Sequence, residues 1–152
     1  SEADNAAIRM LDSEGLAPYF DYIFIDNSPS LSSILIAALS ASDSVIIPCK
    51  TDRLSMSGLH YLYDTINAVI NDKSDAGNPE LKIKGVIGTV YKKSQEGNEI
   101  VELLQSDKEH PVLGVVPYST LVNKAFNEGR AVVDARPKSA PSKAYVDISN
   151  LI

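Results

Sequence analysis

The fold is indicated by the stretch Tyr22-Ile-Phe-Ile-Asp-Asn-Ser-Pro-Ser-Leu31. Its first four residues are apolar without alternation, which is typical of a strand covered on both faces in a parallel sheet. Asp26 follows at the predicted carboxyl end of this strand, where sheets of this kind bind their ligands. A carboxylate there can orient a water molecule in the shell of Mg²⁺, or it can simply cap the loop that follows. The stretch alone leaves both roles open.

Strands and helices alternate along the chain on either side of this stretch. Helices are predicted at residues 5–16 and 30–41, and the apolar run at 44–48 predicts a second buried strand, which completes a strand–helix–strand unit. The spacing of apolar residues from Leu59 to Ile70 predicts a long amphipathic helix. Strands at 83–90 and 112–116 and helices at 98–106, 119–128 and 143–152 follow. The predicted fold class is α/β, a doubly wound and mostly parallel sheet with helices on both faces, in a single domain of residues 1–152.

Composition narrows the class of protein. The chain has 152 residues, of which 44% are apolar and 22% charged, as in one ordinary globular domain. Its apolar runs fall far short of the roughly 20 residues of a membrane helix, so we expect no membrane partner. The lone Cys49 cannot form an internal disulfide, which fits a reducing compartment and predicts a cytoplasmic protein.

Charge is distributed unevenly. The net charge of −6 argues against a protein that coats nucleic acid with its whole surface. The C-terminal end, residues 119–152, is the basic part, with five bases against three acids. These bases either only make the surface soluble or form a local anion-binding face. They are Lys124, Arg130, Arg136, Lys138 and Lys143.

Two other chemistries are not supported by the sequence. His60 and His110 have no Cys or His near them at ligand spacing, so a transition-metal site is not expected. Ser28 and Ser30 lack the Gly-x-Ser-x-Gly context of a nucleophile, and no hydrolase triad is expected. We predict no catalytic residue within this chain.

Several short motifs follow the first stretch in a fixed order. They are the segments Asp43-Ser-Val-Ile-Ile-Pro48, Leu54-Ser-Met-Ser-Gly-Leu59, Gly85-Val-Ile-Gly-Thr89 and Val116-Pro117, and then Gly129-Arg-Ala-Val-Val-Asp134, Pro137-Lys-Ser-Ala140 and Ala144-Tyr145. From about Tyr22 to the end, this series resembles the ParA family of partition ATPases, which are relatives of MinD.

The resemblance implies a deviant P-loop ATPase that dimerises around ATP, binds DNA without sequence preference and is stimulated by a centromere-binding partner. Asp26 then matches the aspartate associated with Mg²⁺, and Pro117 and Tyr118 match the loop beside the adenine. The five C-terminal bases match a DNA-binding surface. The chain departs from the family pattern in two places, with Asn27-Ser-Pro29 in place of Cys-Pro-Pro and Tyr118 in place of a common Arg.

The family's phosphate-binding loop has no counterpart in the chain. None of the eight glycines is followed by lysine, so neither Gly-Lys-Ser nor Gly-Lys-Thr occurs. We therefore expect the C-terminal part of a longer ATPase that uses ATP and Mg²⁺, and expect the chain alone to bind neither and to hydrolyse no ATP. The alternatives are a non-enzymatic α/β module that binds a partner and a MinD-like positioning ATPase. Residues 145–152 carry one acid and no base, which disfavours a membrane-binding closing helix.

Overall fold

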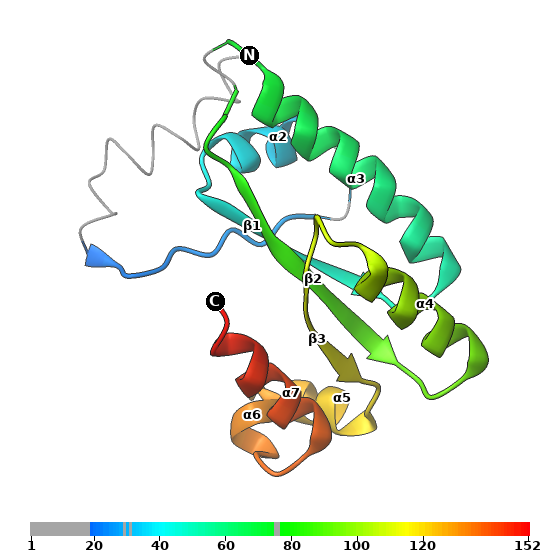
Figure 1. The fold of residues 1–152 in the computed structure, drawn as a ribbon. Coiled ribbons are helices and arrows are strands. Elements are labelled where there is room, and N and C mark those ends of the chain that lie inside the picture. Colours follow the sequence, from blue (N-terminus) through cyan, green and yellow to red (C-terminus); the bar gives the residue numbers. More distant parts are fainter. Residues whose placement is uncertain (1–18, 29, 31, 75–76) are drawn as a thin grey trace. The chain divides into compact units, whose positions relative to one another are not determined.

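The computed structural model describes residues 19–28, 30, 32–74 and 77–152 (Figure 1). The helix predicted at 5–16 lies outside these residues. Contacts divide the chain into two compact units, one made of Ser1–Val45 and His60–Lys82 and the other of Ile46–Leu59 and Ile83–Ile152. The long helix α3 (Arg53–Asn71) and the strand β1 (Ser44–Lys50) contribute residues to both. The prediction of a single domain stays a prediction.

The first unit contains α2 (Ser33–Ser40) and the C-terminal part of α3. Helix α2 lies within the predicted range 30–41 and buries Ala37, Ala38 and Leu39. Asn78 connects the ends of the two helices: its side-chain amide donates to the carbonyl oxygens of Leu39 (3.1 Å) and Ser42 (2.8 Å), and its N–H donates to Val69 O (2.9 Å). These bonds satisfy carbonyl groups that a helix end leaves without an intrahelical partner.

The strand predicted at Tyr22–Ile25 is not formed, and this prediction is wrong for the structure described. These residues have no regular secondary structure, and their side chains are exposed, 66% for Tyr22 and 76% for Phe24. A strand exists only through hydrogen bonds to a neighbouring strand. The apolar sequence favours burial, but the described residues supply no ladder for this segment.

The second unit is built on a three-stranded sheet in the order β1-β2-β3, with β2 at Lys82–Tyr91 and β3 at Val112–Pro117 (Figure 1). Strands β2 and β3 are parallel, and their register runs from Val86 opposite Val112 to Tyr91 opposite Pro117. Parallel neighbours need a crossover connection, which α4 (Gln95–Ser106) supplies. All three strands of the sheet coincide with predicted strands to within about two residues, the usual uncertainty of element ends.

Serine caps mark where most helices of this unit begin. The side chains of Ser94 and Ser119 accept the N–H groups of Gly97 (3.1 Å) and Leu121 (3.2 Å), at the starts of α4 and α5 (Thr120–Asn127). Ser139 caps α7 (Ala140–Ser149) in the same way. The caps explain why α4 begins three residues before its prediction, which followed the apolar spacing alone. The short helix α6 (Val132–Ala135) was not predicted.

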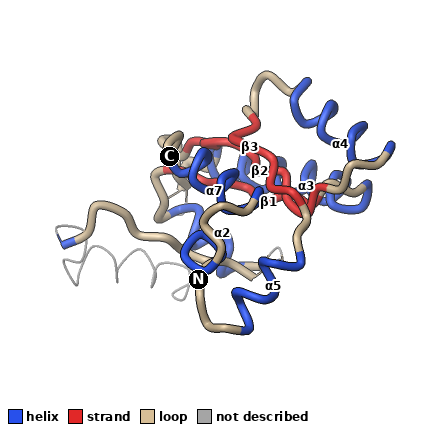
Figure 2. Tube along the Cα trace, turned by 90° about the horizontal axis from the view of Figure 1, so that it is seen from below, coloured by secondary structure: helices blue, strands red, loops and turns tan. Residues whose placement is uncertain are grey.

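Helices α4 and α7 both pack against β3, and α7 also packs against α6. Figure 2 shows α7 beside β3. Ile148 of α7 covers Gly114 of β3 so closely that a Cβ on Gly114 would lie 2.5 Å from Ile148 Cγ1. The buried Ser142 joins α7 to the α6 region, because its hydroxyl lies 2.9 Å from Val132 O and 2.7 Å from Arg136 O. Close packing thus fixes α7 to the sheet, and buried polar contacts fix α7 to the α6 region.

Candidate functional site

The polar residues of the second unit gather where the strands end. Thr51 follows β1, and its N–H donates to Thr89 O of β2 (3.1 Å). Tyr91 ends β2 opposite Pro117, the last residue of β3. The carboxyl ends of the three strands therefore lie side by side, at the edge where parallel α/β sheets bind ligands. We call this group the strand-end edge, and it consists of Thr51, Tyr91, Lys92, Pro117 and Tyr118.

Tyr118 is held at this edge by two contacts. Its N–H donates to Tyr91 O (2.8 Å), which extends the β2–β3 pairing by one residue. The Lys92 ammonium lies 4.8 Å from the centroid of the Tyr118 ring, close enough for a cation–π attraction. Tyr91 is itself fixed from α4, because its hydroxyl lies 2.7 Å from Asn98 Oδ1. The edge thus presents an exposed aromatic ring on a positioned backbone, beside a positive charge.

The backbone just before Tyr91 is strained. Val90 has φ = 56°, in the left-handed region that β-branched residues rarely adopt. The β2–β3 register is irregular between Gly88 and Tyr91, so the strain coincides with a bulge in the ladder. Strain of this kind is concentrated at binding sites, where the surrounding structure maintains it. The strained residue directly precedes Tyr91 and Lys92 of the strand-end edge.

Asp52, next to Thr51, has a structural explanation. Its carboxylate accepts the N–H of Ser55 (2.8 Å) in the first turn of α3. This backbone hydrogen bond is the largest cause of an Asp52 pKa below the ordinary value, while partial desolvation acts in the opposite direction. Nearby Cys49 is buried, and its burial, followed by the charge of Asp52, raises the pKa of the thiol to about 11. Neither residue is a candidate nucleophile or ligand.

Asp26 lies in the first unit and Pro117 and Tyr118 lie in the second, and the metal role of Asp26 stays a prediction. Its side chain is exposed, and the local hydrogen bond to Ile25 O is made by Asn27 (3.3 Å). Among the described residues no three His, Cys, Asp or Glu side chains are grouped as metal ligands. An accessible single carboxylate fits Mg²⁺, which is commonly held by one or two carboxylates together with waters and phosphate oxygens.

The five predicted DNA-binding bases lie on or beside α5, α6 and α7, which contact one another in sequence. Arg136 donates to both carboxylate oxygens of Glu128 (2.7 and 3.4 Å), so part of its charge is neutralised. Arg130 donates to Asp134 O (3.2 Å) and keeps its charge. Lys124, Lys138 and Lys143 are exposed. Their role stays a prediction.

The sequence placed Pro117 and Tyr118 at the end of a predicted strand, where the structure also has them, and their role beside an adenine stays a prediction. It did not single out Tyr91, Lys92 and Asn98. The first two could have been found, because they directly follow a predicted strand that ends at the same edge. Asn98 lies seven residues after Tyr91, and its position depends on the start of α4, which the Ser94 cap sets and the apolar spacing did not indicate. No helix in the described part of the chain is long and apolar enough to span a membrane.

Comparison with known proteins identifies the family. Residues 6–83 match the AAA_31 family model, described as an AAA domain, which is about half of the chain. An uncharacterized protein of Methanocaldococcus jannaschii is 35% identical over 135 residues, covering 88% of this chain and 51% of the relative.

Two named relatives are similar at 30% identity. The sporulation initiation inhibitor protein Soj of Bacillus subtilis matches over 140 residues, which are 90% of this chain and 53% of Soj. The chromosome partitioning protein ParA of Myxococcus xanthus matches over 146 residues, 94% of this chain and 50% of that protein. The chain spans about half the length of the curated relatives it matches.

Solved structures confirm the predicted fold class, a parallel α/β sheet with helices on both faces. The Cyanothece McdA(D38A)–ATP complex superposes with a TM-score of 0.81 at 18% identity, covering 99% of this chain and 59% of McdA. The cell division ATPase MinD of Pyrococcus furiosus gives 0.73 at 19% identity, covering 95% and 57%. With the family model and the named relatives, this agreement shows that the chain belongs to the ParA/MinD-type family of P-loop ATPases.

Proposed function

We propose that the chain is the later part of a cytoplasmic ParA-type partition ATPase, in which ATP with Mg²⁺ acts as a dimerisation switch. The observation that carries the proposal is the strand-end edge, where Tyr118 is positioned by Tyr91 and Lys92. Support comes from the relatives, among them McdA solved with ATP and a MinD of Pyrococcus horikoshii solved with Mg-ADP.

In this proposal the edge binds the adenine. Pro117 and the exposed ring of Tyr118 offer a surface on which a base can stack, and stacking on an aromatic ring contributes about 1–3 kcal/mol per base. The Lys92 ammonium lies 4.8 Å from the ring centroid, and the Tyr118 side chain is 49% exposed, which leaves part of it accessible to a base. Val90 and the Tyr91–Asn98 hydrogen bond keep this ring and its backbone in place before the nucleotide arrives.

Asp26 has the role of the Mg²⁺-associated carboxylate. Bound Mg²⁺ supplies charge neutralisation at the β- and γ-phosphates. The contribution of Asp26 is to accept a hydrogen bond from a water of the metal shell and so to orient it. The phosphates themselves require a Gly-Lys loop, which we place in sequence preceding Ser1 in a longer protein.

The proposed cellular role is that of the family: movement of DNA or of a protein cluster. The ATP-bound homodimer would bind DNA without sequence preference through the bases of α5 to α7, and a centromere-binding partner would stimulate hydrolysis. The rival function is that of a non-enzymatic module that binds a partner. The two functions differ in the longer reading frame, which would encode a phosphate-binding loop for an ATPase and none for the non-enzymatic module.

Nucleotide binding by the longer protein tests the proposal. Tyr118→Ala should weaken binding of a fluorescent ATP analogue by about tenfold, the equivalent of one stacking contact. Tyr61→Ala, which removes another exposed tyrosine, in α3 (67% exposed, against 49% for Tyr118), is the matched control and should leave affinity unchanged. Equal affinities of the wild type and Tyr118→Ala would exclude the strand-end edge as the base site.

The Mg²⁺ role of Asp26 needs a separate measurement. Asp26→Asn in the longer protein should raise the Mg²⁺ concentration needed for half-maximal ATP turnover while leaving the thermal midpoint unchanged, because the side chain is exposed. The 152-residue chain alone should show no Mg²⁺-dependent turnover, since it lacks the groups that stabilise the charge of phosphoryl transfer. Turnover by this chain alone contradicts the proposal.

A further inference from the structure

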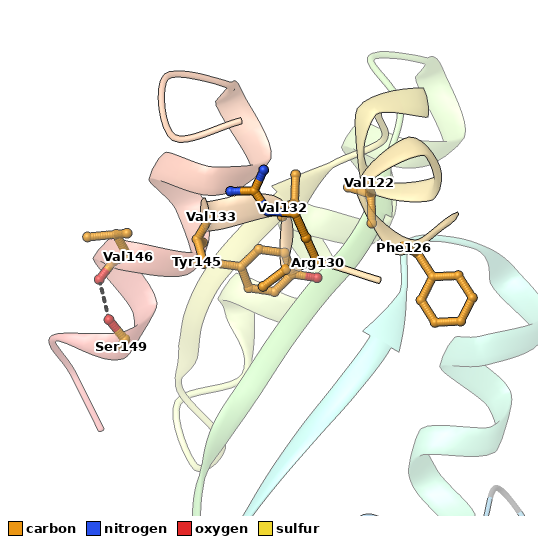
Figure 3. Close-up of a pocket in the computed structure, with 9 residues that line it drawn as sticks. Val122, Phe126, Arg130, Val132, Val133, Tyr145, Val146 and Ser149 are labelled. Carbon is orange, nitrogen blue, oxygen red and sulfur yellow. Dashed lines mark hydrogen bonds between the residues drawn. The ribbon is translucent and has the colours of Figure 1, made fainter. Parts of the chain in front are cut away.

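An apolar groove lies between the C-terminal helices of the second unit, away from the residues of the strand-end edge. It has a volume of about 550 Å³, within the range of ligand-binding clefts. Figure 3 shows Val122 and Phe126 on α5 along one side, Tyr145 and Val146 on α7 along the other, and Val132 and Val133 of α6 between them. Ser149 and Ala131 complete the lining, and the loop residue Arg130 is its one charged member.

The groove is open and its rims are apolar. Phe126 is 81% exposed and Val146 is 51% exposed, although each lies on a well-capped helix next to buried core residues, Ala125 and Ile148. Large exposed apolar side chains clustered on one face, with polar residues around them, are typical of surfaces that bind another molecule. An enclosed small-molecule cavity would bury these rims instead.

Charge limits the chemistry of the occupant. The lining contains Arg130 and no acid. Around it, Lys124 lies in the last turn of α5, and Lys143 lies in α7. Residues 119–152 contain three acids, Glu128, Asp134 and Asp147. Glu128 forms an ion pair with Arg136 (2.7 Å). This end of the chain is positive, although the whole protein carries −6.

We propose that the α5–α7 groove binds an amphipathic, acidic segment of a partner protein, with apolar side chains in the groove and a carboxylate at Arg130. The Arg130 guanidinium suits that carboxylate, because its planar donors match carboxylate geometry. The apolar contacts of Val122, Phe126 and Val146 supply affinity, and the surrounding bases select against basic partners. The site does not depend on nucleotide binding at the strand-end edge.

Duplex DNA is the competing occupant, and the observations favour a peptide. Contacts to DNA phosphates need basic side chains and make no use of valine and phenylalanine side chains. The basic side chains that do not line the groove, Lys138 among them, remain available to DNA. Substitutions of the apolar rim residues by uncharged polar residues therefore distinguish peptide binding from DNA binding, because they remove apolar contact without altering charge.

The test uses the longer protein and two synthetic peptides of about 14 residues with the same leucines at helical spacing. One peptide carries glutamates on its polar face, and the other carries lysines. Fluorescence anisotropy should show the acidic peptide binding at least about tenfold more tightly. The double variant Phe126→Ser/Val146→Ser should lose about tenfold or more in affinity for it, with unchanged circular dichroism, because both side chains are exposed.

Charge reversal supplies the second arm. Arg130→Glu should reduce or reverse the preference for the acidic peptide, whereas Lys108→Glu, the same charge change outside the groove, should not. A random duplex should bind the Phe126→Ser/Val146→Ser variant as it binds the wild type. Equal binding of the two peptides, or an acidic peptide unaffected by the serine substitutions, overturns the proposal. Loss of duplex binding in the serine variant, without loss of peptide binding, assigns the groove to DNA. Self-association abolished by the serine substitutions assigns it to a second copy.

Discussion

Ile148 of α7 lies directly over Gly114 of β3, where a Cβ would be 2.5 Å from Ile148 Cγ1 and 2.9 Å from Cδ1. The glycine therefore permits a close approach of the C-terminal helix to the sheet. This contact attaches α7 to the sheet. Helix α7 and its neighbours α5 and α6 carry the basic residues and line the apolar groove.

The first prediction follows from that contact. Gly114→Ala should lower the free energy of unfolding by about 1–3 kcal/mol, because the added methyl group overpacks the β3–α7 interface. Gly58→Ala is the matched control: it lies within α3 with nothing within 4 Å of the added Cβ, and it should stabilise by about 0.5–1 kcal/mol through helix propensity. Denaturant unfolding measures both. Destabilisation of equal size in the two variants would refute the packing explanation.

Ser142 provides a second prediction. It is fully buried, and its hydroxyl is within hydrogen-bond distance of the carbonyl oxygens of Val132 and Arg136. Ser142→Ala should cost about 1–3 kcal/mol, since a buried carbonyl loses its donor. Ser57→Ala, on the exposed side of α3, removes a hydroxyl bonded only to its own helix at Arg53 O (3.2 Å) and should change stability by less than about 0.5 kcal/mol. A thermal midpoint unchanged by Ser142→Ala contradicts the buried-bond assignment.

Asp52 gives a prediction for pH. The Ser55 N–H lowers the Asp52 pKa below that of an unfolded chain, so the folded state binds the proton less readily. The stabilisation is therefore complete above the unfolded pKa of about 4 and is lost as pH falls through the folded pKa. Asp52→Ala should cost about 1 kcal/mol at pH 7, the value of a helix cap. The difference from wild type should shrink as the pH falls below about 4. A difference that stays constant down to pH 2 would show that the charge of Asp52 contributes nothing.

Val90 tests whether backbone strain serves the strand-end edge. A β-branched residue at φ = 56° costs about 1–3 kcal/mol, so Val90→Gly should stabilise the protein by about 1 kcal/mol after the entropic cost of glycine. The same variant in the longer protein should bind nucleotide more weakly, because Tyr91 and Tyr118 are less well positioned. Val112→Gly, at an ordinary strand position, should only destabilise. If Val90→Gly also destabilises, the strain assignment is wrong.

The basic residues give a prediction for DNA binding by the longer protein. If all five bases of one subunit met phosphates, log K would fall with log salt at a slope of about −4 to −5, and an ATP-bound dimer would roughly double it. Replacing Lys124, Arg130 and Lys138 by Ala should weaken binding equally for unrelated duplexes. The matched control replaces Lys73, Lys82 and Lys108, which removes the same charge elsewhere. Indistinguishable effects of the two triple variants would locate the DNA surface outside α5 to α7.

The sequence by itself determined the alternation of strands and helices, the parallel class of the sheet and the family resemblance, because apolar periodicity and local motifs are properties of neighbouring residues. It located β1, β2 and β3 and the edge residues Pro117 and Tyr118. Helix starts were missed where a cap decided them, as at Ser94, since the apolar spacing begins later than the hydrogen bonding.

Tertiary structure decided what depends on partners distant in sequence. The segment Tyr22–Ile25 has the composition of a buried strand but stays exposed, because a strand requires a neighbouring ladder. The stacking of Lys92 on Tyr118 needs the pairing of β2 with β3. The groove of α5 to α7 is lined by residues of three helices, so it exists only once these helices have packed together. No single segment encodes these relationships, because each is a contact between surfaces that folding brings together.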